Sequence, residues 1–304
     1  NVNKNGICIY KKYDMFKMLS EHGIILSFYR IVTVFDDAMI DNFKATKVLL
    51  YEKKYIWADI ELCRELLKFD GFSLKFIENQ TSELCDIALR SNESSIKYVK
   101  SQNYELCMSS FFRNFNTFEY IKDKFQSKEM CEIAVNKNGL FLKYVRADLN
   151  TFEINKIAVK QNGLAIKYVN RSTYSTENMG ELYKIAVKQN IRSLSHINEN
   201  FQSVDLLKYA VNINGMALTF VKSNLQTDQL CKLAILQDGM ALQCVKSDLR
   251  TEELCLIALW RDIRIIDQID DLGDNSIYNS KNKYNSKKFK NMILNRCISG
   301  KFFN

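Results

Sequence analysis

Residues 214–235 read NGMALTFVKSNLQTDQLCKLAI and residues 238–259 read DGMALQCVKSDLRTEELCLIAL, so nearly the same string recurs after 24 residues. The cysteine of the Leu-Cys pair anchors a longer series, with spacings of 22, 22, 24, 24, 28, 24, 24 and 24 residues. The anchor positions are Cys63, Cys85, Cys107, Cys131, Asn155, Tyr183, Leu207, Cys231 and Cys255. A period of about 20 to 50 residues is typical of a solenoid or another repeat architecture.

Apolar residues stand at fixed offsets from each anchor. The residue before the anchor and the residue four positions after it are apolar in all nine repeats, and alanine stands three positions after it in seven. These offsets fall on one face of an α-helix, with alanine where two backbones would approach closely. The pattern predicts an amphipathic helix that begins near a capping residue such as Thr151, Ser203 or Thr227.

An aspartate or asparagine follows seven residues after every anchor, and in five repeats glycine comes next. The short polar side chain can cap a following helix, and glycine can take the left-handed conformation that ends the preceding one. We therefore expect a second helix in each repeat, with its own buried pair such as Leu218 and Val221.

Two helices of roughly nine residues each would be too short to be stable alone. Stacked units can bury a continuous apolar seam, which is how solenoids are stabilised. The sequence thus predicts an all-α fold, an α-solenoid of about nine two-helix repeats of roughly 24 residues.

The columns also suggest three parts of the chain. We expect an N-terminal helical cap over residues 1–58, in which MFKMLSEHGIILSFY resembles a degenerate repeat, and the repeat array over residues 59–270. Residues 271–304 have no apolar period and are expected to form a polar linker and a basic C-terminal tail.

Charge is concentrated in that tail. The chain carries a formal charge of +8, and residues 281–304 hold seven basic residues and no acid, which leaves +1 for the rest. The candidate anion-binding residues of the tail are Lys281, Lys283, Lys287, Lys288 and Lys290. The chain has no secretory signal pattern or long apolar run, and its nine cysteines show no close pairing. We expect an intracellular, cytoplasmic protein with reduced thiols and without membrane insertion.

Three stretches carry a family resemblance: MCEIAVNKNGLFLKYV, INKIAVKQNGLAIKYV and LLKYAVNINGMALTFV. They fit the pattern L-C-x-x-A-V-x-x-N-G-x-A-L-x-Y-V, which resembles a tandem helical-repeat family known only as a domain of unknown function. Members of that family occur in large DNA viruses, protists and some intracellular bacteria. The resemblance implies a helical fold and no catalytic chemistry.

The columns offer little chemistry. Equivalent positions of stacked helices lie about 8–10 Å apart, too far for disulfides, so we expect the cysteine column to pack in the core. His196 takes a position that other repeats give to aromatic residues, and His22 a capping position. We find no phosphate-binding loop or nucleophile motif. We expect no enzymatic activity, no cofactor and no metal.

Basic residues recur at two fixed positions of the second helix from repeat to repeat, with tyrosines beside them, and we call these positions the basic columns. The candidate partner-binding residues are Lys97, Lys100, Lys143, Arg146, Lys167, Lys222 and Lys246. Our first hypothesis is a scaffold that binds another protein through its extended surface. The alternative is RNA or DNA binding led by the tail and these columns. A solvated helix face is the simpler explanation of the lysines, because acids at the starts of the first helices nearly cancel their charge, and capping explains the asparagine column more simply than a bound peptide does.

Overall fold

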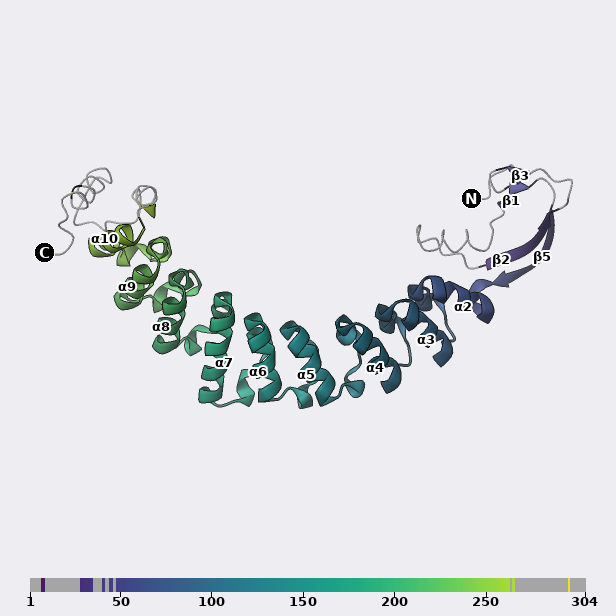
Figure 1. Cartoon of the computed structure of the whole chain (residues 1–304), viewed down its shortest axis with the longest axis horizontal. Coiled ribbons are helices and arrows are strands. Elements are labelled where there is room, and N and C mark those ends of the chain that lie inside the picture. Colours follow the sequence, from purple (N-terminus) through teal and green to yellow (C-terminus); the bar gives the residue numbers. More distant parts are fainter. Residues whose placement is uncertain are drawn as a thin grey trace. The chain divides into compact units, whose positions relative to one another are not determined.

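The structure, a computed structural model, describes residues 7–8, 28–34, 40–41, 44–45, 48–262, 264–265 and 295. Within each of the chain's two compact units, helical repeats stack one on the next, and the fold is an α-solenoid, as the sequence predicts (Figure 1). The chain divides into two compact units, Asn1–Gln126 and Ser127–Asn304. The predicted linker and tail over residues 271–304, with its five candidate lysines, lie outside the described residues apart from residue 295.

In the first unit, three α-helices each lead into a 3₁₀ helix of six residues, and α2 packs against α3 and α3 against α4. The pairs are α2 (Ile60–Phe69) with η2 (Gly71–Phe76), α3 (Ser82–Ser91) with η3 (Glu93–Tyr98), and α4 (Tyr104–Arg113) with η4 (Phe115–Tyr120). Two shorter 3₁₀ helices are η1 (Ile56–Ala58) and η5 (Asp123–Phe125).

The second unit repeats this pattern. Its longer elements are α5 (Lys128–Lys137), η6 (Gly139–Tyr144), α6 (Phe152–Gln161), η8 (Gly163–Tyr168), α7 (Thr176–Gln189), η10 (Ile191–His196), α8 (Val204–Ile213), η12 (Gly215–Phe220), α9 (Asp228–Gln237), η14 (Gly239–Cys244) and α10 (Glu252–Arg261). Three-residue 3₁₀ helices precede α6 to α10: η7 (Ala147–Leu149), η9 (Arg171–Thr173), η11 (Glu199–Phe201), η13 (Ser223–Leu225) and η15 (Ser247–Leu249).

Strands stand in part of the segment for which we predicted a helical cap, residues 1–58. Strands β2 (Phe28–Val34) and β5 (Val48–Tyr55) pair antiparallel, and β1 (Ile7–Cys8), β4 (Lys44–Ala45) and β3 (Ile40–Asp41) form a second small sheet. The sequences FYRIVTV and VLLYEKKY are rich in the β-branched and aromatic residues that favour strands. The helical prediction is therefore wrong for these residues, and most of the proposed degenerate repeat lies outside the described residues.

From η2 to η14, the second helix of the repeats also differs from our expectation, because it is a six-residue 3₁₀ helix and not an α-helix of about nine residues. The second helix expected after α10 lies largely outside the described residues. In η12 the buried Leu218 is followed three residues later by the buried Val221, whose N–H donates to the Leu218 carbonyl at 3.1 Å. A spacing of three is the period of a 3₁₀ helix. The buried pair was identified correctly, but its period was assigned to the wrong helix type.

The asparagine column caps helices as predicted, and one residue serves two of them. The N–H of Asn214 donates to the Ala210 carbonyl at the end of α8, at 3.1 Å, while its Oδ1 accepts from Met216 N–H at the start of η12, at 2.8 Å. Its backbone is extended, with φ −154° and ψ 115°. The Oδ1 bond recurs from Asp70 to Asp262 at the residue two positions on.

The glycine that follows has a different role from the one we expected. None of the glycines in the described repeats has φ between +20° and +160°, so none needs the left-handed conformation. A Cβ on Gly215 would instead lie 2.3 Å from the carbonyl oxygen of Ala234 in the next α-helix, and one on Gly139 would lie 2.2 Å from that of Ala158. Glycine is present because two neighbouring repeats approach too closely for a side chain.

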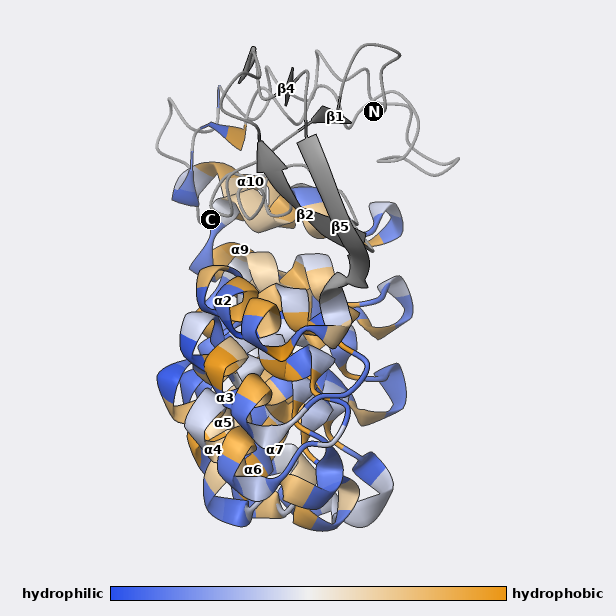
Figure 2. Cartoon of the chain, turned by 90° about the vertical axis from the view of Figure 1, so that its right-hand side faces the viewer, coloured by the Kyte–Doolittle hydropathy of each residue, from blue (hydrophilic) through white to orange (hydrophobic). Residues whose placement is uncertain are grey.

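The core consists of the predicted columns. In α8, Leu206, Leu207, Ala210 and Val211 are each no more than 3% exposed. Figure 2 shows apolar and hydrophilic residues alternating along the helices, as this one-sided burial requires. The cysteine column is buried as well, at Cys63, Cys85, Cys107, Cys131, Cys231 and Cys255.

A buried glutamine joins neighbouring repeats, a feature that the sequence analysis missed. Gln226, which precedes the cap of α9, is 7% exposed. Its Nε2 donates to the carbonyl of Cys244 at 3.0 Å, and its Oε1 accepts from Lys246 N–H at 2.8 Å, both in the following repeat. Gln80 makes the same pair of bonds to Tyr98 and Lys100. The side chain thus satisfies backbone groups that helix hydrogen bonds leave unpaired.

We predict that Gly215→Ala lowers the free energy of unfolding by about 1–3 kcal/mol, because the added methyl group forces α9 away from η12. Gly180, inside α7, is the matched control, since a Cβ there meets nothing within 4 Å. Gly180→Ala should raise stability by up to about 1 kcal/mol through helix propensity. Urea denaturation of both variants measures the difference, and equal effects would contradict the close-approach account.

Gln226→Leu should cost about 2–4 kcal/mol, because the Cys244 carbonyl and the Lys246 N–H then lose their partner in the core. Gln243→Leu is the control: Gln243 is exposed and makes only a 4.0 Å contact to the Met216 sulfur. Its cost should stay within about 0.5 kcal/mol. If denaturation finds both variants equally stable, the glutamine does not hold the repeats together.

Candidate functional site

The first column of candidate lysines lies at the ends of the 3₁₀ helices, beside aromatic rings. Lys97 Nζ is 4.6 Å from the ring centroid of Phe72 and 4.9 Å from that of Tyr98. Lys143 and Lys167 lie over the following tyrosines, Tyr144 at 4.2 Å and Tyr168 at 4.8 Å. Cation–π attraction therefore holds these ammonium groups against the protein while the side chains stay exposed.

The second column pairs largely with acids or carbonyl groups. Arg146 lies 2.7 Å from Asp148, Lys222 lies 3.0 Å from Glu199, and Lys246 lies 3.3 Å from Asp248. Lys100 Nζ donates to the Glu78 carbonyl at 3.0 Å. The positive column is thus interrupted by carboxylates, as a solvated surface would be.

Burial governs the chemistry of the cysteine column. It raises the pKa of the thiols of Cys63, Cys107, Cys131 and Cys231 to about 11, so these groups stay protonated near neutral pH. Over the described part of the chain, no group of three or more His, Cys, Asp or Glu side chains could hold a metal ion.

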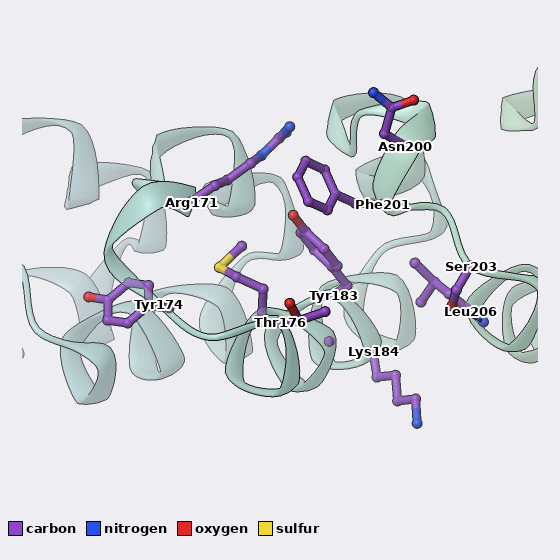
Figure 3. Close-up of a pocket in the computed structure, with 11 residues that line it drawn as sticks. Arg171, Tyr174, Thr176, Tyr183, Lys184, Asn200, Phe201, Ser203 and Leu206 are labelled. Atoms are coloured by element: carbon purple, nitrogen blue, oxygen red, sulfur yellow. Dashed lines mark hydrogen bonds between the residues drawn. The ribbon is translucent and has the colours of Figure 1, made fainter.

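The most distinctive site is the irregular repeat, where the anchor spacing is 28 residues. Helix α7 has 14 residues where α6 and α8 have 10, so it begins about one turn earlier. Tyr183 stands at the anchor position, where six repeats have cysteine, and Tyr174 stands before the cap, where five repeats have glutamine. A pocket of about 250 Å³ opens here between η9, α7 and η11 (Figure 3).

Apolar and polar side chains share the walls of this pocket. Met179 and Leu206 are buried apolar residues, and Phe201, 47% exposed, lies across from the first turns of α7. Arg171 comes from η9, and its guanidinium carbon is 5.8 Å from the ring centroid of Phe201. One guanidinium N–H donates to the His196 carbonyl at 2.6 Å, so the side chain is held by the Phe201 ring and by this hydrogen bond.

Tyr183 presents an unpaired hydroxyl to the pocket. The residue is 3% exposed, its ring centroid is 6.4 Å from that of Phe201, and its hydroxyl has no hydrogen-bond partner among the described residues. Burial raises its pKa, against a lowering by the charge of Arg171, so the hydroxyl keeps its proton. An unsatisfied buried hydroxyl costs about 1–3 kcal/mol, which marks this position as unusual.

Tyr174, on the opposite side of the same pocket, is fully engaged. Its hydroxyl donates to the Asn150 carbonyl at 3.0 Å and accepts from Asn155 Nδ2 at 2.8 Å. It therefore links this repeat to the preceding one, whereas Gln226 bonds to the following repeat. The carbonyl that corresponds to that of Cys244, the His196 carbonyl, accepts from Arg171 instead. Burial raises the pKa of Tyr174, and the hydrogen bond from Asn155 lowers it.

Sequence reasoning recorded the 28-residue spacing and the tyrosine in the cysteine column but did not interpret them as a site. None of the seven candidate basic residues lines this pocket, and its charged residues Arg171 and Lys184 were not singled out. The signal that could have found it was the coincidence of an insertion with two changed columns in one repeat.

Comparison with known proteins finds a family match for part of the repeat array, and that family has no known function. The family described as a domain of unknown function, DUF4116, matches residues 128–172, which run from α5 to η9. No curated protein and no solved structure matches the chain. Within its described part, the chain has no helix with the length and apolar character needed to cross a membrane.

We predict opposite outcomes for two tyrosine-to-phenylalanine changes in this repeat. Tyr183→Phe removes a hydroxyl that has no partner and should leave the free energy of unfolding unchanged or raise it by up to about 1 kcal/mol. Tyr174→Phe removes two hydrogen bonds and should lower it by about 1–3 kcal/mol. Thermal and urea denaturation compare them, and a loss at Tyr183 as large as that at Tyr174 would show that its hydroxyl is paired.

Proposed function

We propose that this chain is a non-enzymatic helical-repeat scaffold that binds another protein through the extended surface of its stacked repeats. The observation that carries the proposal is a set of exposed apolar side chains in the last two positions of three consecutive α-helices, with Leu236 and Trp260 at equivalent positions and Ile213 one position later. Ile213 of α8 is 41% exposed, Leu236 of α9 is 40% exposed and Trp260 of α10 is 58% exposed. We call these three residues the apolar row.

Neighbouring contacts keep the apolar row together. Helices α8 and α9 pack against each other, as do α9 and α10. Gln237 accepts a hydrogen bond from the Gly215 N–H, and Arg261 donates to the Gln237 carbonyl at 3.3 Å. The C-terminal ends of α9 and α10, which carry Leu236 and Trp260 at equivalent positions, are therefore linked to each other, and the end of α9 is linked to the start of η12.

Exposed tryptophan favours binding over simple solvation. Tryptophan and large aliphatic residues are enriched among the side chains that contribute most to protein interfaces. The guanidinium of Arg261 lies 6.0 Å from the Trp260 ring centroid, which restricts the ring before any partner arrives. A partner that covers the apolar row gains apolar burial with little ordering cost.

Several observations support binding in preference to catalysis or nucleic-acid recognition. The residues that line the α7 pocket include no histidine and no carboxylate to act as a general base. Among the candidate basic residues, Arg146, Lys222 and Lys246 already pair with acids, which weakens attraction for phosphates. We also infer that the repeats outside residues 128–172 share the family likeness, and that the protein works in a reducing cytoplasm, since the seven cysteines between Cys63 and Cys255 are free.

The test uses Leu236→Lys with Trp260→Lys, a pair of changes that the fold should tolerate because Lys68, Lys160 and Lys188 stand at the same position of other repeats. The matched control is Val204→Lys, at the first residue of α8, where α5 has Lys128. Val204 is 64% exposed at the opposite helix end. All variants should have the same free energy of unfolding as the wild-type protein.

Wild-type and control protein, used as affinity baits in a lysate of the native source, should enrich the same partner protein near one-to-one stoichiometry. The double variant should bind the purified partner at least about tenfold more weakly, a change of about 1.4 kcal/mol. Undiminished partner binding by the double variant would refute the apolar row. Recovery of RNA or DNA alone, lost as salt rises, would favour the alternative function.

A further inference from the structure

We propose that the pocket beside α7 binds a carboxylate group that is attached to an apolar or aromatic moiety. The pocket combines a fixed guanidinium, an unpaired buried hydroxyl and apolar walls within about 250 Å³. Such a combination of a few placed polar groups with apolar lining is typical of ligand sites. Neither the repeat pattern nor the apolar row accounts for it.

The insertion in α7 creates the pocket. The additional turn adds Thr176 and Met179 to one wall, and Gly180 follows it at the position where regular helices begin. Helix η9 carries Thr173 where η5, η7, η11, η13 and η15 have phenylalanine or leucine. A Cβ on Gly180 would meet nothing within 4 Å. The repeat thus lacks the apolar side chain that fills this place in regular repeats.

The Tyr183 hydroxyl is the first donor for the ligand. Figure 3 shows its ring extending from α7 toward Phe201 and Arg171, with the hydroxyl at the near end. The hydroxyl keeps its proton at neutral pH and has no partner among the described residues. A carboxylate oxygen would supply the acceptor that this buried group lacks.

Arg171 is the second donor. Its bond to the His196 carbonyl and its position over the Phe201 ring hold the guanidinium plane in place, and these contacts use one N–H. An arginine presents five N–H donors in a rigid fork that matches the two oxygens of a carboxylate. Tyr183 and Arg171 together can therefore hold both oxygens of one carboxylate.

The charged residues around the pocket favour an anionic group of the size of a carboxylate. Its lining residues include two cations, Arg171 and Lys184, and no acid. The nearby Glu181 and Glu199 are paired with Lys156 at 2.8 Å and Lys222 at 3.0 Å. Lys184 points away from Arg171 and Tyr183 in Figure 3, so two donor groups converge, which suits a carboxylate better than the three oxygens of a phosphate.

The carboxylate has two sources: an acidic side chain or C-terminus of the partner protein, or a free small molecule. The first source rests on the proposed function, whereas the carboxylate site itself does not. Ile213, Leu236 and Trp260 do not line this pocket, so changes to the apolar row should leave it intact.

The experiment titrates the full chain with 3-phenylpropionate and with its neutral amide, 3-phenylpropionamide, and follows binding by backbone NMR shifts. The carboxylate should bind at least about tenfold more tightly, with shifts centred on η9, α7 and η11. Tyr183→Phe should weaken it about fivefold or more and Arg171→Gln about tenfold or more. Arg192→Gln, an exposed arginine outside the pocket, should leave it unchanged.

Equal binding of acid and amide, tighter binding of 2-phenylethyl phosphate, or wild-type affinity in both pocket variants would overturn the proposal. Thermal denaturation shows that each variant is folded before it is titrated. Once a partner is isolated, weaker partner binding by Arg171→Gln assigns the carboxylate to that protein, and unchanged partner binding with weakened 3-phenylpropionate assigns it to a free ligand. Failure of the Leu236 and Trp260 test would refute the apolar row alone.

Discussion

Each repeat depends on one aspartate or asparagine that ends an α-helix with its backbone and begins a 3₁₀ helix with its side chain. At Asn138 the N–H bonds to Ala134 and Oδ1 accepts from Leu140, while the extended backbone between them, φ −148°, turns the chain sharply. A longer side chain could not reach an N–H only two residues on. This geometry explains why the column admits no other residue types, and it brings the next residue against the neighbouring repeat.

The close approach of glycine to alanine follows from that turn. In one repeat that lacks the glycine the partner column changes too: Glu93 takes the glycine position in η3, and in α4 Ser110 replaces alanine and its Oγ donates to the Glu93 carbonyl at 2.9 Å. At the contact between these repeats, a hydrogen bond therefore takes the place of the close packing of glycine against alanine. The two columns form one interface, although they lie in different repeats.

The sequence predicted what depends on local or periodic chemistry, such as the buried faces, the caps and the stacking. It did not predict why Gly215 is glycine, because the atom that excludes a side chain belongs to Ala234 in the next repeat. The glutamines that join neighbouring repeats, such as Gln80 and Gln226, were missed for a similar reason. We call them the glutamine ladder. A polar residue next to a cap is normally expected to face solvent. For the α7 pocket, Tyr183 was visible as a departure from the cysteine column, but a departure alone does not show whether its hydroxyl is paired.

The irregular repeat shows why a regular array leaves little room for binding small groups. At Gln226 the amide pairs with backbone on both sides, whereas near α7 the ladder is broken and Asn150, Asn155, Tyr183 and Gln202 each bury an oxygen without a partner among the described residues. Such groups lower stability unless something else binds them. The glutamine is also absent before α6, where Asn150 stands, and before α10, where Arg250 stands, but among the described repeats only that of α7 combines its loss with an insertion and a pocket. That combination is the reason to propose a ligand there.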